Sequence, residues 1–150
     1  MAHQARIDIA YLKMAREWSK LSVAERKKVG CLIVKDSQII SDGFNGTPAG
    51  FPNECEDING KTLRHVLHDE SNAITKLAKS TNSSVGSTLY TTLSPCFECS
   101  KLIVQSGIKK VIYCEEYREK EGPRLLERAG VEVKEVKLID GKLRPQHGEG

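Results

Sequence analysis

A short strand that runs almost directly into a proline and two cysteines constrains this chain more than any other feature. Residues 88–92 are rich in β-branched and aromatic side chains, and the segment Ser94-Pro95-Cys96-x-x-Cys99 follows after a single residue. Proline suits the first position of a helix and serine is a good N-cap, so the sequence predicts a helix that begins at Pro95 and is capped by Ser94. Both cysteines then lie in the first helical turn.

The two cysteines indicate a metal site. Side chains at positions i and i+3 of a helix lie on the same face, so the sulfurs of Cys96 and Cys99 can reach one ion. The positive end of the helix dipole favours their thiolate forms, and zinc takes sulfur ligands. Two sulfurs do not complete a zinc site, so other residues must supply the remaining ligands.

A second pattern, His68-x-Glu70, supplies what the cysteines lack. It opens a predicted helix, and sites in sheets of this kind form at helix N-termini and at the carboxyl ends of strands, where the two patterns would converge. A catalytic zinc has three protein ligands and one open position, and His68, Cys96 and Cys99 are three candidates. Glu70 is then available to take a proton from water and pass it to a substrate nitrogen.

Other interpretations of these residues stay open at this point. A structural zinc is normally closed by four ligands, often from two Cys-x-x-Cys pairs, and this chain has one such pair. A redox pair also has the Cys-x-x-Cys spacing, but the preceding proline and the upstream His-x-Glu are unlike that motif. Cys55 and His65 suggest a second metal site, the alternative being an exposed loop cysteine.

Hydrophobic periodicity predicts a helix, two strands, and then alternating helices and strands. The first two strands form an antiparallel hairpin, and the later strands are parallel with helices on both faces. The predicted elements are a helix over 7–21, strands over 29–34 and 38–41, a helix from 68, a strand over 88–92, a helix from 96 that ends near Gly107, a strand over 110–114, a helix over 123–129 and an edge strand over 131–136. We expect one domain over residues 1–150, with a disordered tail from about residue 140.

Composition excludes several classes of function. A hydrophobic content of 39% and a charged content of 29% are typical of a soluble globular protein. A net charge of +3 and 5% aromatic residues do not support the basic, aromatic-lined groove of a protein that binds a nucleic acid polymer. No segment approaches the roughly 18 apolar residues of a membrane span. Five cysteines, without a secretory signal, favour a reduced, cytoplasmic location.

Two loops are candidates for contact with an anionic ligand. Residues 43–51 read Gly-Phe-Asn-Gly-Thr-Pro-Ala-Gly-Phe, and backbone N–H groups in such loops can hold phosphate. The loop does not match the P-loop or the dinucleotide fingerprint, so a plain structured turn is the alternative. The basic run 26–28 is either a solvated turn or the source of one cation that faces the ligand.

The combined pattern of His-x-Glu followed by Pro-Cys-x-x-Cys is the signature of zinc-dependent nucleobase deaminases. With the glycine-rich loop beside it, the chain resembles the deoxycytidylate (dCMP) deaminase family of phages and eukaryotes, within the cytidine deaminase superfamily. The resemblance runs from the first helix to about Val136. The segments that carry it are 28–30, 43–48, 68–74, 91–99 and 105–111.

This resemblance implies a fold and a reaction. The fold is a three-layer α/β/α sandwich with a five-stranded mixed sheet. The reaction is hydrolysis of dCMP to dUMP and ammonia, which supplies thymidylate synthesis. One catalytic Zn²⁺ would be held by His68, Cys96 and Cys99, with Glu70 as the proton carrier.

The resemblance also implies substrate contacts. Asn45 is the candidate at the sugar and phosphate, and Tyr117 and Arg118 are candidates near the phosphate. Arg118 suits that role unaided, because a guanidinium pairs with phosphate through two hydrogen bonds. An exposed loop arginine is the alternative.

Regulation and assembly are further implications of the family. Its members are activated by dCTP and inhibited by dTTP, for which Mg²⁺ is a candidate partner ion. We expect the effector site at Arg26, Phe44 and Gly46, and a homohexameric assembly that couples distant sites. The zinc-binding insertion of some phage relatives is missing, which argues against a second metal.

Asp69 departs from the family pattern, in which alanine usually stands between the histidine and the glutamate. An extra carboxylate could raise the pKa of Glu70 or of water, or it could point into solvent or cap the helix. Its presence suggests a preference for 5-substituted dCMP. Two competing functions stay open. One is a cytidine, guanine or tRNA-adenosine deaminase, against which the glycine-rich loop argues. The second is an inactive zinc-binding regulatory module, against which intact Glu70 argues.

Overall fold

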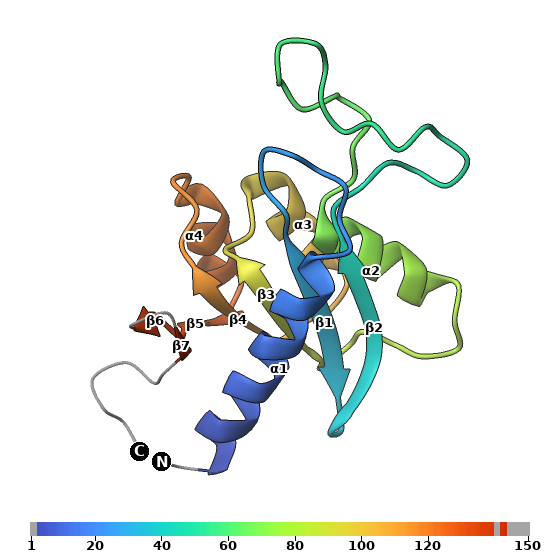
Figure 1. Cartoon of the computed structure of the whole chain (residues 1–150). Coiled ribbons are helices and arrows are strands. Elements are labelled where there is room, and N and C mark those ends of the chain that lie inside the picture. Colours follow the sequence, from blue (N-terminus) through green and yellow to red (C-terminus); the bar gives the residue numbers. More distant parts are fainter. Residues whose placement is uncertain (1–2, 140–141, 144–150) are drawn as a thin grey trace.

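A five-stranded mixed sheet with the strand order β2-β1-β3-β4-β5 forms the centre of the computed structural model (Figure 1). β1 pairs antiparallel with both β2 and β3, whereas β4 runs parallel to β3 and to the edge strand β5. The predicted hairpin followed by parallel strands is therefore confirmed. The strands are β1 (Gly30–Lys35), β2 (Gln38–Phe44), β3 (Thr88–Leu93), β4 (Lys110–Glu115) and β5 (Glu132–Glu135).

The hairpin turn follows from two residues with unusual backbone angles. Asp36 and Ser37 both have positive φ, of 52° and 61°. Two consecutive residues in this region are typical of the two-residue type I′ turn, whose twist matches that of the strands it joins. β2 continues to Phe44, three residues beyond its predicted end, so it carries the glycine-rich segment to the edge of the sheet.

Helices cover both faces of the sheet, as the predicted three-layer sandwich requires. α1 (His3–Ser19) packs on one face, where Leu12 and Ala15 meet Leu32 of β1 and Tyr90 of β3. The opposite face carries the other three helices (Figure 1). They are α2 (Asp69–Ala78), α3 (Phe97–Gln105) and α4 (Glu121–Arg128).

The alternation of side chains along β1 explains the two cores. Cys31 and Ile33 face α2 and α3, whereas Leu32 and Val34 face α1, because successive residues of a strand point to opposite sides. All four are buried. Cys31 is thus a small core residue.

The structure describes residues 3–139 and 142–143. Most of the tail expected to be disordered from about residue 140 lies outside them. Two short strands, β6 (Leu138–Ile139) and β7 (Lys142–Leu143), pair with each other beyond the predicted elements. None of the helices in this described part of the chain is both long and apolar enough to cross a membrane.

Residues 46–67 leave the sheet as a long loop, drawn in green above the rest of the fold in Figure 1. Backbone pairing between Gly46 and Leu67 closes the base of this loop, and pairing between Glu56 and Thr62 closes its outer part. We call residues 46–67 the excursion loop. It returns the chain directly to the start of α2.

A glycine in β2 lets α2 approach the sheet. A Cβ atom on Gly43 would lie 2.8 Å from the backbone nitrogen of Ala73 and closer still to the carbonyl oxygen of Asp69. We predict that Gly43→Ala lowers the free energy of unfolding by about 1–3 kcal/mol, because α2 must move away from the sheet. Denaturant unfolding measures this change.

The control is Gly46→Ala, since no atom lies within 4 Å of the Cβ it would add. We expect this variant to stay within about 0.5 kcal/mol of the parent. Equal losses in the two variants would contradict the steric explanation.

Candidate active site

Three of the predicted ligands meet at one point. His68 Nδ1 lies 3.3 Å from Cys99 Sγ and 3.5 Å from Cys96 Sγ. Their ligand atoms all lie within 4.8 Å of one another. Tetrahedral zinc with ordinary Zn–N and Zn–S bonds would hold such atoms about 3.6 Å apart, so the donor set fits the ion. No other group of metal-ligating side chains is found over residues 3–139.

Both halves of this cluster stand at helix starts, but the start of α3 differs from the prediction. The predicted helix begins at Pro95 with Ser94 as its cap, whereas α3 begins at Phe97 and is capped by Cys96. Cys96 Sγ accepts the hydrogen bond from the backbone nitrogen of Cys99 at 3.5 Å. Cys96 Sγ is therefore the capping acceptor, the role predicted for Ser94 Oγ.

Ser94 has another partner, which explains the shift. Its Oγ accepts a hydrogen bond of 2.7 Å from the backbone nitrogen of Tyr117, in the loop after β4. Gly122 at the start of α4 lies against the turn, because a Cβ there would overlap the carbonyl oxygen of Pro95. Glu119 Oε1 accepts from the backbone nitrogen of Phe97 at 3.0 Å. The segment between β4 and α4 thus holds the cysteine turn in place.

The two cysteines of the cluster differ in acidity. The hydrogen bond from Cys99, followed by the contact with His68, lowers the pKa of Cys96 to about 4. The same hydrogen bond, together with burial, raises the pKa of Cys99. The contact with Cys96 raises the pKa of His68. A metal ion binding here would therefore displace protons from Cys99 and His68.

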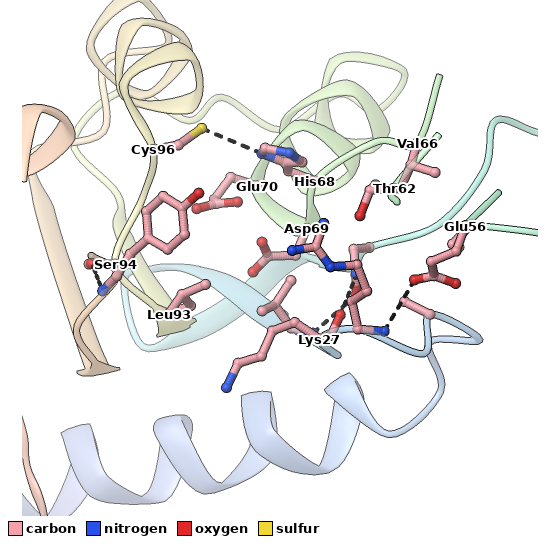
Figure 2. Close-up of a pocket in the computed structure, with 16 residues that line it drawn as sticks. Lys27, Glu56, Thr62, Val66, His68, Asp69, Glu70, Leu93, Ser94 and Cys96 are labelled. Carbon is pink, nitrogen blue, oxygen red and sulfur yellow. Dashed lines mark hydrogen bonds between the residues drawn. The ribbon is translucent and has the colours of Figure 1, made fainter. Parts of the chain in front are cut away.

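Glu70 lies in the same cavity as the cluster. The cavity has a volume of about 260 Å³ and is lined by His68, Cys96, Asp69 and Glu70, among others (Figure 2). Glu70 is 4% exposed. Burial raises its pKa well above the usual value, and the neighbouring Asp69 carboxylate raises it further. A buried carboxyl with a raised pKa beside a metal cluster is suited to proton transfer.

Asp69 neither points into solvent nor caps the helix. It is 2% exposed, and its Oδ2 accepts a hydrogen bond of 2.9 Å from Thr91 Oγ1 in β3. The cap position of α2 belongs to His68, whose side chain makes no capping hydrogen bond. Asp69, in the first turn of α2, therefore contacts β3, the strand that leads to the cysteines.

The other end of the cavity is basic. Arg26 and Lys27 both line the cavity, and Figure 2 shows Lys27 at the end away from Cys96. Lys27 Nζ bonds to Glu115 at 2.6 Å, whereas Arg26 takes part in no salt bridge within the described residues. The cavity thus joins an acidic, metal-binding end to a cationic end.

Asn45 fixes the backbone around the basic run 26–28. Its Oδ1 accepts from the backbone nitrogen of Val29 at 3.0 Å, and its Nδ2 donates to the carbonyl oxygen of Lys27 at 2.8 Å. Glu56 of the excursion loop accepts from the backbone nitrogens of Glu25 and Arg26 at 3.0 and 3.2 Å. Asn45 also lines the cavity. Its predicted contact with the sugar and phosphate stays a prediction.

The remaining predicted nucleotide contacts lie in different places. Tyr117 lines the cavity, but Arg118 is exposed and is not part of the lining. Phe44 packs edge-on against Trp18, with ring centres 6.3 Å apart, and Gly46 pairs with the end of the excursion loop. Neither lines the cavity, whereas Arg26 does. The predicted effector residues are therefore divided between the cavity and its surroundings.

Cys55 contradicts the expectation of an exposed loop cysteine. It is 2% exposed and lines the cavity, because the excursion loop folds over this side of the site. His65 instead stacks with Phe51, with ring centres 5.2 Å apart. Cys114 is half-buried, and its thiol donates to the carbonyl oxygen of Thr92.

Sequence reasoning missed several residues of the site. The excursion loop adds Glu56, Thr62 and Val66 to the cavity, and Glu119 supports the start of α3. None of these has a local motif, since each acts on a segment far away in the chain. Lys27 had a weak signal in the basic run 26–28.

Comparisons with known proteins agree with this geometry. A family model described as the cytidine and deoxycytidylate deaminase zinc-binding region matches residues 5–115. Deoxycytidylate deaminase of Enterobacteria phage T4 is 38% identical over an alignment covering 71% of this chain and 77% of its own. The Saccharomyces cerevisiae deoxycytidylate deaminase is 33% identical over 89% of this chain and 46% of its own.

Solved structures are also similar. The dCMP deaminase from cyanophage S-TIM5, in complex with dCMP and dUMP, aligns with a TM-score of 0.85 and 47% identity, over 90% of this chain and 98% of its own. A Thermotoga maritima diaminohydroxyphosphoribosylaminopyrimidine deaminase and reductase aligns with a TM-score of 0.70 and 29% identity. It covers 89% of this chain, which matches 37% of that protein.

Removal of one sulfur ligand tests the metal site. We predict that Cys99→Ser lowers zinc affinity strongly, because a serine hydroxyl is a poor zinc ligand. Loss of a residue that only hydrogen-bonds to a ligand typically costs roughly 10–100-fold in affinity, and loss of the ligand itself should cost more. Elemental analysis after dialysis gives the zinc content. Cys114→Ser is the matched control, since this thiol lies outside the cluster. Full zinc occupancy in Cys99→Ser would contradict the proposed ligand set.

Proposed function

Because the chain belongs to the cytidine and deoxycytidylate deaminase family, we propose that it removes the amino group of dCMP by hydrolysis, giving dUMP and ammonia. The observation that carries this proposal is a single cavity that holds the His68, Cys96 and Cys99 cluster together with buried Glu70. One Zn²⁺ fits the cluster, and when bound it would polarise the attacking water.

The chain's own residues supply the proton transfer. The reaction forms a C4–O bond and breaks the bond between C4 and the exocyclic nitrogen of cytosine. Water therefore gives up two protons, one to the ring nitrogen N3 and one to the departing amino group. Glu70 is the carboxyl available for both transfers, and its raised pKa lets it hold the proton between them. Burial of Glu70 keeps bulk water from competing for that proton.

The basic end of the cavity supports a phosphorylated substrate over a free nucleoside. Arg26 lines this end without a carboxylate partner among the described salt bridges, and Glu56 fixes its backbone. A guanidinium pairs well with phosphate. The S-TIM5 relative is described in complex with dCMP and dUMP, which supports the same choice of substrate class. Asn45 and Tyr117 also line the cavity, and Arg118 is a further candidate near the phosphate.

Regulation and cellular role complete the proposal and rest on the family resemblance alone. The proposed regulation is activation by dCTP and inhibition by dTTP, with Mg²⁺ as partner ion. The proposed assembly is a homohexamer of chains that each form a single domain over residues 1–150. The proposed role is a cytoplasmic supply of dUMP for thymidylate synthesis. Phe44 and Gly46 lie outside the cavity lining, so an effector bound by them would leave the substrate cavity open. The rate of ammonia release from dCMP, measured with and without dCTP or dTTP, tests this regulation.

Loss of the proton carrier tests the proposed reaction. We predict that Glu70→Gln keeps zinc but lowers kcat for dCMP by about 10²–10⁴-fold, since general acid–base catalysis typically contributes that much. Ammonia release measures turnover. Glu98→Gln is the control, because this exposed side chain lies between the two cysteines and pairs only with Lys101 among the described salt bridges. Near-normal turnover in Glu70→Gln would overturn the assignment.

The basic end generates a second test. We predict that Arg26→Gln raises KM for dCMP about tenfold or more, since loss of a charged hydrogen-bonding partner costs roughly 1.5–3 kcal/mol. KM for deoxycytidine, which has no phosphate, should change little. Arg118→Gln run in parallel shows whether that exposed residue also reaches the phosphate. Arg6→Gln, in the first turns of α1, serves as the charge-matched control. An unchanged KM for dCMP in Arg26→Gln would contradict this placement.

A further inference from the structure

The residue between His68 and Glu70 has a role that the metal site does not explain. Asp69 is buried at the boundary of the cavity, and a buried carboxylate is costly unless it is hydrogen-bonded. Asp69 Oδ2 accepts a hydrogen bond of 2.9 Å from Thr91 Oγ1, and Thr91 is fully buried in β3. This pair is polar in a place where apolar residues would be the ordinary choice.

The bond joins the two halves of the candidate site. Asp69 belongs to the first turn of α2, next to His68 and Glu70. Thr91 belongs to β3, the strand that leads into the turn carrying Cys96. Within residues 3–139 it is the one side-chain hydrogen bond that joins α2 to β3.

Two other side-chain hydrogen bonds near the start of α2 lead to β2. Asn72 Nδ2 donates to the carbonyl oxygen of Phe44 at 2.8 Å, and Ser41 Oγ donates to that of Ala73 at 2.7 Å. These bonds hold α2 against the edge of the sheet. The bond from Thr91 adds a polar connection to β3, beside the apolar contacts of α2 with the sheet and α3 and the contact of His68 with Cys99.

We propose that Asp69 is a positioning residue, whose hydrogen bond from Thr91 sets the place of Glu70 relative to the cysteine half of the site. This inference rests on the proposed deamination. Proton transfer depends steeply on geometry, and a displacement of about 1 Å can cost roughly 10²-fold in rate. Removal of the bond should therefore act on kcat, while the cations at the far end keep their contact with substrate.

The structure offers variants that isolate the bond. In Asp69→Ala the Thr91 hydroxyl keeps an acceptor, the carbonyl oxygen of Leu93 at 3.1 Å. Asp69→Asn keeps an acceptor oxygen without the charge. Thr91→Val removes the donor at constant shape but strands the carboxylate, so it is paired with the double variant Asp69→Ala/Thr91→Val.

Steady-state kinetics with dCMP, zinc content and thermal unfolding test the inference on the zinc-loaded protein. We expect Asp69→Ala to lose about 10–100-fold in kcat with KM within about threefold and full zinc content. Asp69→Asn also removes a charge that acts on Glu70, so each protein is compared at its own pH optimum. There Asp69→Asn should stay within about threefold of wild-type kcat, because the amide oxygen still accepts from Thr91. The double variant should be no slower than Asp69→Ala, since both changes remove one interaction.

Three results would overturn the inference. They are wild-type kcat in Asp69→Ala, an equal loss in Asp69→Asn and Asp69→Ala, and a loss that follows zinc content or KM instead of kcat. Failure of the proposed function is a separate outcome, since the wild-type protein would then release no ammonia from dCMP. In that case the melting temperatures still test the bond. The loss in the double variant must be smaller than the sum of the single losses.

Discussion

The whole site depends on two helices that begin at the same edge of the sheet. His68 and Cys96 are both N-cap residues, so the donor atoms of the cluster lie at the positive ends of α2 and α3. The cap role also explains the local use of sulfur at Cys96, which satisfies the backbone nitrogen of Cys99 while it remains available to a metal. A movement of either helix start would separate the histidine from the cysteines.

Each helix start is held from outside the cluster by close backbone approach. Gly43 allows α2 to lie against β2, and Gly122 allows α4 to lie against the turn that begins α3. Any larger side chain at either position would overlap backbone atoms, and well-packed interiors yield little to such overlap. The two glycines are therefore part of the geometry of the site although neither carries a functional group.

Periodicity and local motifs predicted the layers, the strand directions and the convergence of His68 with the cysteines, because these follow from short-range patterns. The exact start of α3 was predicted wrongly, since capping preferences favour Ser94 but a backbone nitrogen from the loop after β4 occupies its oxygen. The excursion loop was beyond prediction for a related reason. Glu56 acts on Arg26 from 30 positions away, and Lys27 meets Glu115 across 88, so no local signal exists for either contact.

The excursion loop also bears on the choice of substrate, although it carries no catalytic group. Glu56 binds the backbone of Arg26, and the pairing of Gly46 with Leu67 places the loop beside the cavity. A guanidinium whose backbone is fixed loses less conformational entropy when it meets a phosphate than one on a free turn. Loss of these backbone contacts would weaken the recognition of a phosphorylated substrate before it affected the chemistry at Glu70. In the proposed reaction the two ends of the cavity have separate roles, with phosphate recognition assigned to the basic end and proton transfer to the metal-binding end.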